Sequence, residues 1–170
     1  MKLTAAPVTP APVAASPSTF SIYDENLATS WGEFSFGGSY DASTEESHSG
    51  SVSFKANMNG WGAVKLRTDS PGLLLTDLDS GANTSNVFLR FYVKGSGTAN
   101  IRVKVNSKRH EMTISPQGQW MQVSLALDLF QASMVGVYQV EIQNKSSSNL
   151  VLYFDEIDIH HILQVVEDTR

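Results

Sequence analysis

The sequence predicts an all-β protein, a two-sheet antiparallel β-sandwich of the jelly-roll type. About ten short segments rich in β-branched, aliphatic and aromatic residues are separated by turns of Gly, Asn and Ser. Several of these segments alternate apolar and polar residues with period two, and no segment keeps a helical period for more than two turns. Many short strands at this spacing are typical of sandwiches and jelly rolls.

Composition limits the class of protein further. The chain of 170 residues fits one domain with a sizeable core. Its net charge is -5 and its Lys and Arg residues are scattered, so we expect no nucleic-acid partner. It has no cysteine, which excludes disulfides, thiolate metal sites and a cysteine nucleophile. No apolar run approaches the length of about 18 residues that a membrane span needs, so we expect no membrane partner.

Residues 1–18 predict a linker. Four of the six prolines stand here, at positions 7, 10, 12 and 17, among Ala, Val, Thr and Ser, which favours an extended, partly polyproline chain. A signal peptide is the alternative, because Lys2 supplies a charged start, but no uninterrupted apolar stretch follows it. A linker implies a covalently attached neighbouring domain. The sandwich module is expected at residues 19–161, and residues 162–170 form a short polar-ended tail.

Within the module each apolar segment between two turns is taken as one strand. In order, the expected strands are residues 19–23, 32–36, 51–57, 63–68, 86–94, 99–106, 109–114, 120–126, 138–143 and 150–159. The only weak helical segment is 127–134.

Alternation predicts which side chains share a face, because successive residues of a strand point to opposite sides. The apolar set expected to face the core is Val64, Leu66, Val87, Leu89, Phe91, Val93, Ile101, Val103, Val105, Met121, Val123, Leu125, Val140 and Ile142. The complementary set is rich in planar amides, cations and occasional large aromatic rings.

The last expected strand combines two characters. Its first half is almost continuously apolar, as in a strand buried on both sides, whereas Asp155, Glu156 and Asp158 place three carboxylates in the second half. Buried carboxylates need backbone N–H groups, cations or solvent as partners.

The outward set offers the groups that bind a sugar. A sugar ring presents hydroxyls around its edge and apolar C–H patches on its faces, so it is recognised by aromatic platforms with planar donors and acceptors beside them. The candidate ligand-binding residues are Trp61, Trp120, Tyr92, Arg90, Arg102, Lys104, Gln139, Glu141, Gln143 and Trp31. The alternative is an ordinary solvated strand face, and for Trp31 both readings stay open. Phe34 and Phe36 share a face and are expected to pack in the core.

No enzyme is indicated. The sequence lacks the Gly-x-Ser-x-Gly, His-Glu-x-x-His and phosphate-loop patterns, and the neighbouring His160 and His161 would point to opposite faces of a strand. Glu33, Glu141 and Glu156 have no spacing that singles them out as an acid and base.

Acidic residues offer oxygen ligands for calcium. Candidates lie at Asp24-Glu25, at Glu45-Glu46 before a Gly-ended turn, and at Asp155. Simple solvation of acidic loops is the alternative.

Six ordered segments carry a family resemblance. They are Ile-Tyr-Asp-Glu-Asn-Leu-Ala-Thr-Ser-Trp (22–31), Ser-His-Ser-Gly-Ser-Val-Ser-Phe (47–54), Gly-Trp-Gly-Ala-Val-Lys-Leu (60–66), Val-Phe-Leu-Arg-Phe-Tyr-Val-Lys-Gly (87–95), Gln-Trp-Met-Gln-Val-Ser-Leu (119–125) and Leu-Tyr-Phe-Asp-Glu-Ile (152–157). Together they resemble the galactose-binding-like β-jelly-roll carbohydrate-binding modules, with no particular family singled out.

The resemblance implies a secreted or cell-surface module that binds a cell-wall-type polysaccharide, such as a β-glucan, without cleaving it. It also implies that the module targets an attached partner to that polysaccharide. It further implies one structural Ca²⁺ held by Asp24, Glu46 and Asp155, with backbone carbonyls near Ile22 and Gly50. The alternative is a structural or adhesive cell-surface β-sandwich that binds no sugar.

Overall fold

The structure, a computed structural model, describes residues 18–162 and confirms the predicted antiparallel β-sandwich. In chain order the strands are β1 (Thr19–Asp24), β2 (Asn26–Leu27), β3 (Gly32–Glu33), β4 (Phe36–Ser43), β5 (Ser53–Arg67), β6 (Leu73–Leu74), β7 (Val87–Lys94), β8 (Ala99–Val105), β9 (Lys108–Ile114), β10 (Met121–Ala126), β11 (Gly136–Val137), β12 (Gln139–Asn144) and β13 (Leu150–His161). The expected linker at 1–18, apart from Ser18, and the expected tail at 162–170, apart from Ile162, lie outside the described residues.

Within the described part of the chain, helix is confined to two short pieces. The helix α1 (Leu75–Leu78) has four residues, and a 3₁₀ turn at Leu127–Leu129 replaces the weak helical segment expected at 127–134. No helix of residues 18–162 has the length and apolarity needed to cross a membrane.

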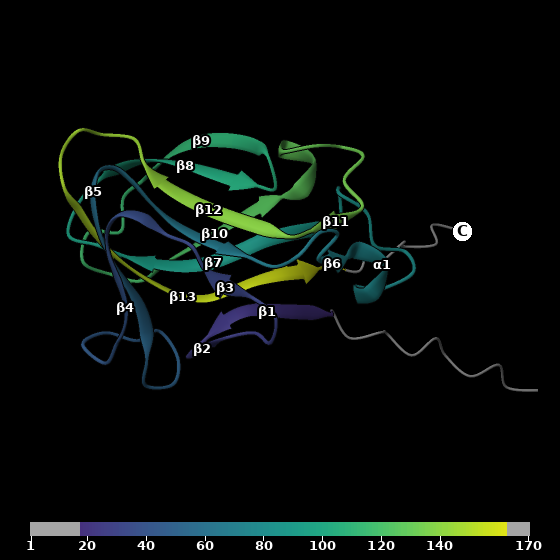
Figure 1. The fold of residues 1–170 in the computed structure, drawn as a ribbon, viewed down its shortest axis with the longest axis horizontal. Helices are drawn as coiled ribbons and strands as arrows, with labels where there is room; N and C mark the ends of the chain where they lie inside the picture. The colour runs from purple at the N-terminus through teal and green to yellow at the C-terminus, as the bar shows by residue number, and fades with distance from the viewer. Residues whose placement is uncertain (1–17, 163–170) are drawn as a thin grey trace, which may run out of the picture.

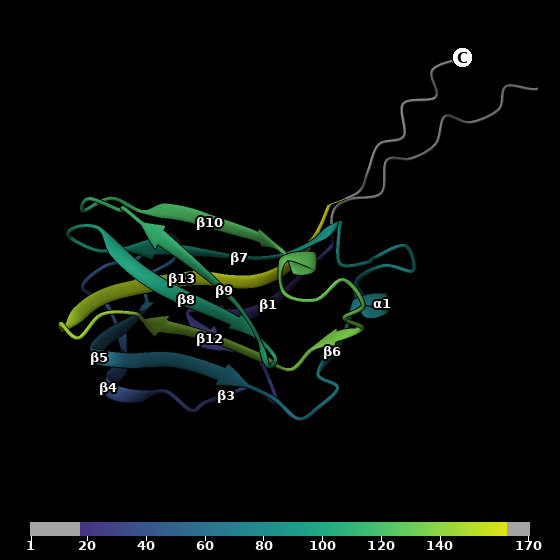
Figure 2. The ribbon, with the colours of Figure 1, turned by 90° about the horizontal axis from the view of Figure 1, so that it is seen from above.

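The strand β5 joins the two layers of the sandwich. Its first half pairs with β13 and β4, with Phe54 opposite Phe154, whereas its second half pairs with β12 and β3, with Leu66 opposite Val140. One continuous hydrogen-bonded network therefore folds into two sheets at the middle of β5. We call the layer β4, first half of β5, β13, β7 and β10 sheet 1, to which β1 adds along the second half of β13. We call the layer β3, second half of β5, β12, β8 and β9 sheet 2 (Figures 1 and 2).

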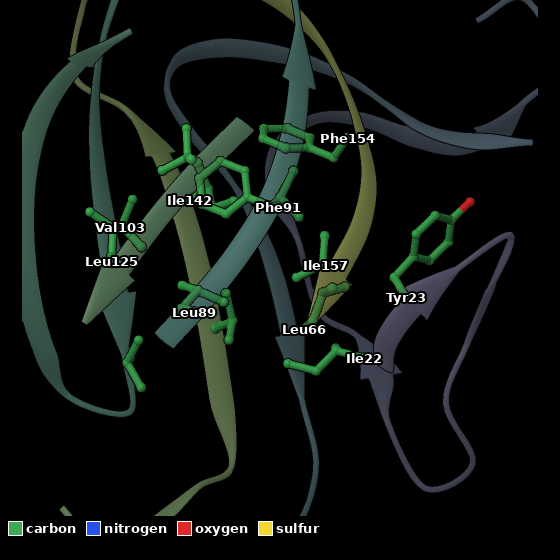
Figure 3. Close-up of a cluster of buried hydrophobic side chains, with 14 of the residues drawn as sticks. Ile22, Tyr23, Leu66, Leu89, Phe91, Val103, Leu125, Ile142, Phe154 and Ile157 are labelled. Atoms are coloured by element: carbon green, nitrogen blue, oxygen red, sulfur yellow. The ribbon is translucent and has the colours of Figure 1, made fainter. Parts of the chain in front are cut away.

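The core lies between these sheets, as alternation predicts. Every residue of the expected inward set is buried except Met121, which is half-buried. Figure 3 shows Phe91 and Phe154 from sheet 1 beside Ile142 and Val103 from sheet 2, and the rings of Phe91 and Phe154 meet edge to face at 5.9 Å. Burying such large side chains is the main stabilising contribution to a fold of this kind.

Two expectations about strands were incomplete. The segments expected separately at 51–57 and 63–68 form the single 15-residue strand β5, because the Asn59 to Gly62 turn signal is a bend within a strand and not its end. The strand β4 was missed, since Gly37, Gly38 and Ser39 resemble a turn in sequence. In the structure a Cβ on Gly38 would lie 2.1 Å from the carbonyl oxygen of Asn57, so only glycine allows β4 to approach β5 there.

Candidate functional site

The outer face of sheet 2 collects polar side chains into cross-strand rows. Register places Lys65, Glu141, Lys104 and Arg109 side by side on β5, β12, β8 and β9. The next row, on β12, β8 and β9, contains Gln143, Arg102 and Glu111. On the other side of the first row, Arg67 lies opposite Gln139. Five of the predicted ligand-binding residues, namely Arg102, Lys104, Gln139, Glu141 and Gln143, therefore share one surface.

Ion pairs and hydrogen bonds hold these side chains in place. Glu141, only 3% exposed, accepts a hydrogen bond from Lys104 Nζ at 2.6 Å, and Lys65 Nζ lies 4.0 Å from its second oxygen. Glu111 accepts bonds from Arg102 Nη2 at 2.8 Å and from Lys145 Nζ at 3.1 Å. The pKa of Glu111 is lowered, first by the bond from Arg102 and then by the bond from Lys145. Rows fixed in this way present preorganised planar groups.

Large aromatic side chains border this face. Trp61 at the bend of β5 is 51% exposed, and Lys145 Nζ lies 5.4 Å from the centre of its ring. Its backbone has a positive φ of 67°, and its carbonyl accepts a bond of 2.9 Å from the Gln143 side chain. The bend of β5 thus turns the indole into solvent beside the row of Gln143 and Arg102.

Phe34 and Phe36 were expected in the core and that expectation was wrong. Phe34 is 57% exposed and Phe36 is 44% exposed. The backbone N–H of Phe34 donates to the carbonyl oxygen of Lys65, and Phe36 at the start of β4 pairs with Ala63, so both lie beside the second half of β5, at the edge of sheet 2. Alternation showed that the two rings share a face, but their exposure on an edge strand depends on long-range pairing. They are members of the candidate site that sequence reasoning missed.

Two hollows open at the ends of this face. One, of about 340 Å³, is lined by Asn100, Ile101, Glu111, Met112, Thr113 and Lys145. The other, of about 460 Å³, is lined by Ser30, Trp31, Gly32, Phe34, Arg67, Thr68 and Asp69. Trp31 is 8% exposed, packs against Phe20 and belongs to the core cluster, so it contributes to the wall of this hollow and not to an open platform.

The remaining predicted ligand-binding residues lie on the opposite face of the sandwich. Tyr92 and Arg90 point outward from β7 in sheet 1, and Trp120 precedes β10, which pairs with β7. The ring of His48 stacks on Tyr92 at 3.6 Å and meets Trp120 edge to face at 5.8 Å, while its Nδ1 contacts Glu156. One face of the Tyr92 ring is therefore already covered by a side chain of the protein.

The buried carboxylates of β13 have hydrogen-bonding or charged partners, as their burial requires. Asp155, fully buried, accepts backbone N–H bonds from His48, Ser49 and Glu156. Asp158 accepts hydrogen bonds from both Nε and Nη2 of Arg90, with the Nη2 bond at 2.5 Å. Burial raises the pKa of Asp158, and Arg90 opposes that rise.

The predicted calcium ligands do not form one site in the structure. Glu46 accepts a bond of 2.6 Å from Lys94, and both oxygens of Asp155 are engaged by backbone N–H groups. Within residues 18–162 no three His, Asp or Glu side chains are arranged to hold a metal ion. The pKa of Asp24 is raised, first by burial and then by the negative charges of Asp155, Glu156 and Glu25. Negative charge is therefore concentrated around Asp24. Calcium binding stays a prediction.

Comparison with known proteins identifies the fold. No protein-family profile matches the chain, and no curated protein sequence matches it. Among solved structures, a mutant of the module CBM29-2 in complex with mannohexaose has a TM-score of 0.59 at 15% identity, covering 86% of this chain and 93% of that one. Another CBM29-2 mutant, in complex with cellulohexaose, has a TM-score of 0.57 at 17% identity, covering 85% and 91%. A family 29 carbohydrate-binding module scores 0.57 at 17% identity, covering 86% and 90%. The chain therefore has the β-jelly-roll fold found in family 29 carbohydrate-binding modules.

Proposed function

We propose that the protein is a non-catalytic carbohydrate-binding module that binds a cell-wall-type polysaccharide on the outer face of sheet 2. The observation that carries this proposal is the border of solvent-exposed aromatic rings, Phe34, Phe36 and Trp61, beside fixed rows of amide, guanidinium and carboxylate groups. Rings supply the platform for the C–H patches of a sugar, and the rows supply donors and acceptors for its hydroxyls. A structural β-sandwich that only spaces other domains has no need of such a border.

The fold supports this proposal. Two solved structures with the same fold are complexes with mannohexaose and cellulohexaose. Glu141 on the proposed face is held in ion pairs with Lys104 and Lys65, a setting for binding and not for proton transfer to a substrate. Attachment to a polysaccharide raises the effective concentration of a linked partner at that polysaccharide, so weak binding by many contacts is enough for targeting.

Affinity electrophoresis in gels containing β-glucan, xylan, mannan, chitin or polygalacturonate tests the proposal. We expect retardation by at least one of these polymers. We expect Trp61→Ala to weaken binding at least about tenfold, because it removes a platform from the exposed face. Trp120→Ala is the matched control, since Trp120 lies on the opposite face beside His48.

The two tryptophan variants decide between the two faces. Loss of binding in Trp120→Ala with full binding in Trp61→Ala would move the site to sheet 1. A folded wild-type protein that none of the polymers retards would refute the proposed function.

A further inference from the structure

Positive charge is concentrated on the outer face of sheet 2, although the chain as a whole carries a net charge of -5. Six of its twelve Lys and Arg residues lie on this face or at its edge: Lys65, Arg67, Arg102, Lys104, Arg109 and Lys145. Four carboxylates lie there: Glu111 and Glu141 within the rows, Glu33 on the edge strand β3, and Asp69 beside Arg67 at the hollow. The face therefore carries a clear positive excess on an acidic protein.

The ion pairs on this face leave much of that charge unbalanced. Each of the two carboxylates within the rows is shared by two cations, Glu111 by Arg102 and Lys145, and Glu141 by Lys104 and Lys65. Arg67 and Arg109 make no ion pair with any residue of 18–162. Like charges crowded on one surface repel one another unless an anion lies between them.

The outer face of sheet 1 shows the opposite balance. There each cation has its own carboxylate, in the pairs Arg90 with Asp158, Lys94 with Glu46 and Lys55 with Glu45. Glu156 adds a further acid beside His48. The surplus on sheet 2 is thus a property of one face and not of the strands in general.

One of the unpaired guanidinium groups faces a hollow that a sugar could enter. Arg67 lines the 460 Å³ hollow with the rings of Phe34 and Trp31 and the hydroxyls of Ser30 and Thr68, and Asp69 is the one acid in that wall. A guanidinium binds a carboxylate through two parallel hydrogen bonds. Arg67 on β5 and Arg109 on β9 are three strand spacings apart across the sheet and two residues apart along it, roughly 16 Å in all, so together they suit a polymer with repeated carboxylates.

The geometry points to an acidic polysaccharide, one built from uronic acid residues, as the ligand of this face. This inference rests on the proposed function, since it names the class of glycan that the same site takes. The carboxylates of the polymer pair with Arg67, Arg109 and the shared cations between them, while the sugar rings lie on the aromatic border.

Polygalacturonate and its methyl ester provide a matched pair of probes, because esterification removes the charge and keeps the backbone. We expect isothermal titration to show polygalacturonate binding at least about tenfold tighter than the ester or neutral glucomannan, with an affinity that falls as salt rises. Arg67→Gln and Arg109→Gln should each weaken it about five- to tenfold without changing the fold, because neither side chain makes an ion pair in the described structure. Lys55→Gln, which removes the same charge from sheet 1, should have no effect.

Three results would overturn the inference, and they separate it from the proposed function. Equal binding of the ester and the acid, or binding of neutral glycans alone, rejects the acidic ligand and leaves the glycan-binding function standing. Tighter binding of single-stranded DNA than of polygalacturonate assigns the positive face to nucleic acid. No binding of any glycan by the folded protein rejects the function, and the inference with it.

Discussion

At the scale of single residues, the carboxylates of β13 show how far chemistry alone can predict. Three acids in an otherwise apolar strand had to find partners, and they do: backbone N–H groups for Asp155, His48 for Glu156 and Arg90 for Asp158. The kind of partner follows from the cost of burying a charge. Which residue serves as the partner does not follow from that cost, because strand pairing brings Arg90 to Asp158 and a loop brings His48 to Glu156.

The calcium prediction can also be tested at this scale. Asp24, Glu25, Asp155 and Glu156 concentrate negative charge, whereas Glu46 is committed to Lys94. We therefore expect millimolar Ca²⁺ to raise the melting temperature by about 5 °C and chelation to reverse the rise. Asp24→Asn should abolish the calcium effect and Glu46→Gln should preserve it, as measured by differential scanning fluorimetry. An unchanged melting temperature of the wild type with calcium would contradict the prediction.

At the scale of elements, the bend of β5 decides the architecture. The same strand supplies Phe54 and Met58 to one sheet and Val64 and Leu66 to the other, and the bend between them exposes Trp61. Gly62 allows this bend, because a Cβ there would lie 2.2 Å from the carbonyl oxygen of Gly37. The same bend therefore joins the two layers and shapes the proposed binding face.

Gly62→Ala tests that link. Because the added methyl group meets backbone that cannot rotate away, we expect a loss of about 2 kcal/mol of stability, or roughly 4–8 °C in melting temperature. Gly97→Ala is the control, since a Cβ at Gly97 meets no atom within 4 Å. Equal melting curves for the two variants would show that β4 and β5 can separate at little cost.

The elements also show where sequence reasoning stops. Alternation placed every residue of the expected inward set except Met121 in the buried core, because the apolar residues of these strands all occupy one side. It could not tell to which sheet a strand belongs, so Trp61 and Arg102 of sheet 2 were grouped with Trp120, Tyr92 and Arg90 of sheet 1. Phe34 and Phe36 were misplaced for the same reason, since a shared face can be the inner or the outer one. Register and layer are set by contacts between segments far apart in sequence, such as β5 with β12.

At the scale of the whole molecule, the ends of the described chain and the proposed binding face belong to different layers. Thr19 on β1 pairs with His160 on β13, and the N–H of His161 bonds to Ser18, so both ends meet along sheet 1. Figure 1 shows β1 at the bottom of the molecule and β8, β9 and β12 at the top. A partner attached at either end would leave the outer face of sheet 2 accessible.

We therefore expect a fluorescent protein fused at either terminus to change the affinity for an immobilised polysaccharide by less than about twofold.

A bulky group attached beside Trp61 should act differently. The N–H of Trp61 bonds to Ser146, so the exposed Ser147 in the β12–β13 turn lies next to the aromatic border. Because the chain has no cysteine of its own, Ser147→Cys can be labelled at that one position with a polyethylene glycol chain. The unlabelled variant should bind normally and the labelled one should lose most of its affinity, because the polymer covers the platform. Normal binding by the labelled variant, or strong inhibition by a terminal fusion, would place the glycan on another face. Either result would contradict the prediction that the chain ends and the glycan-binding face lie on different layers.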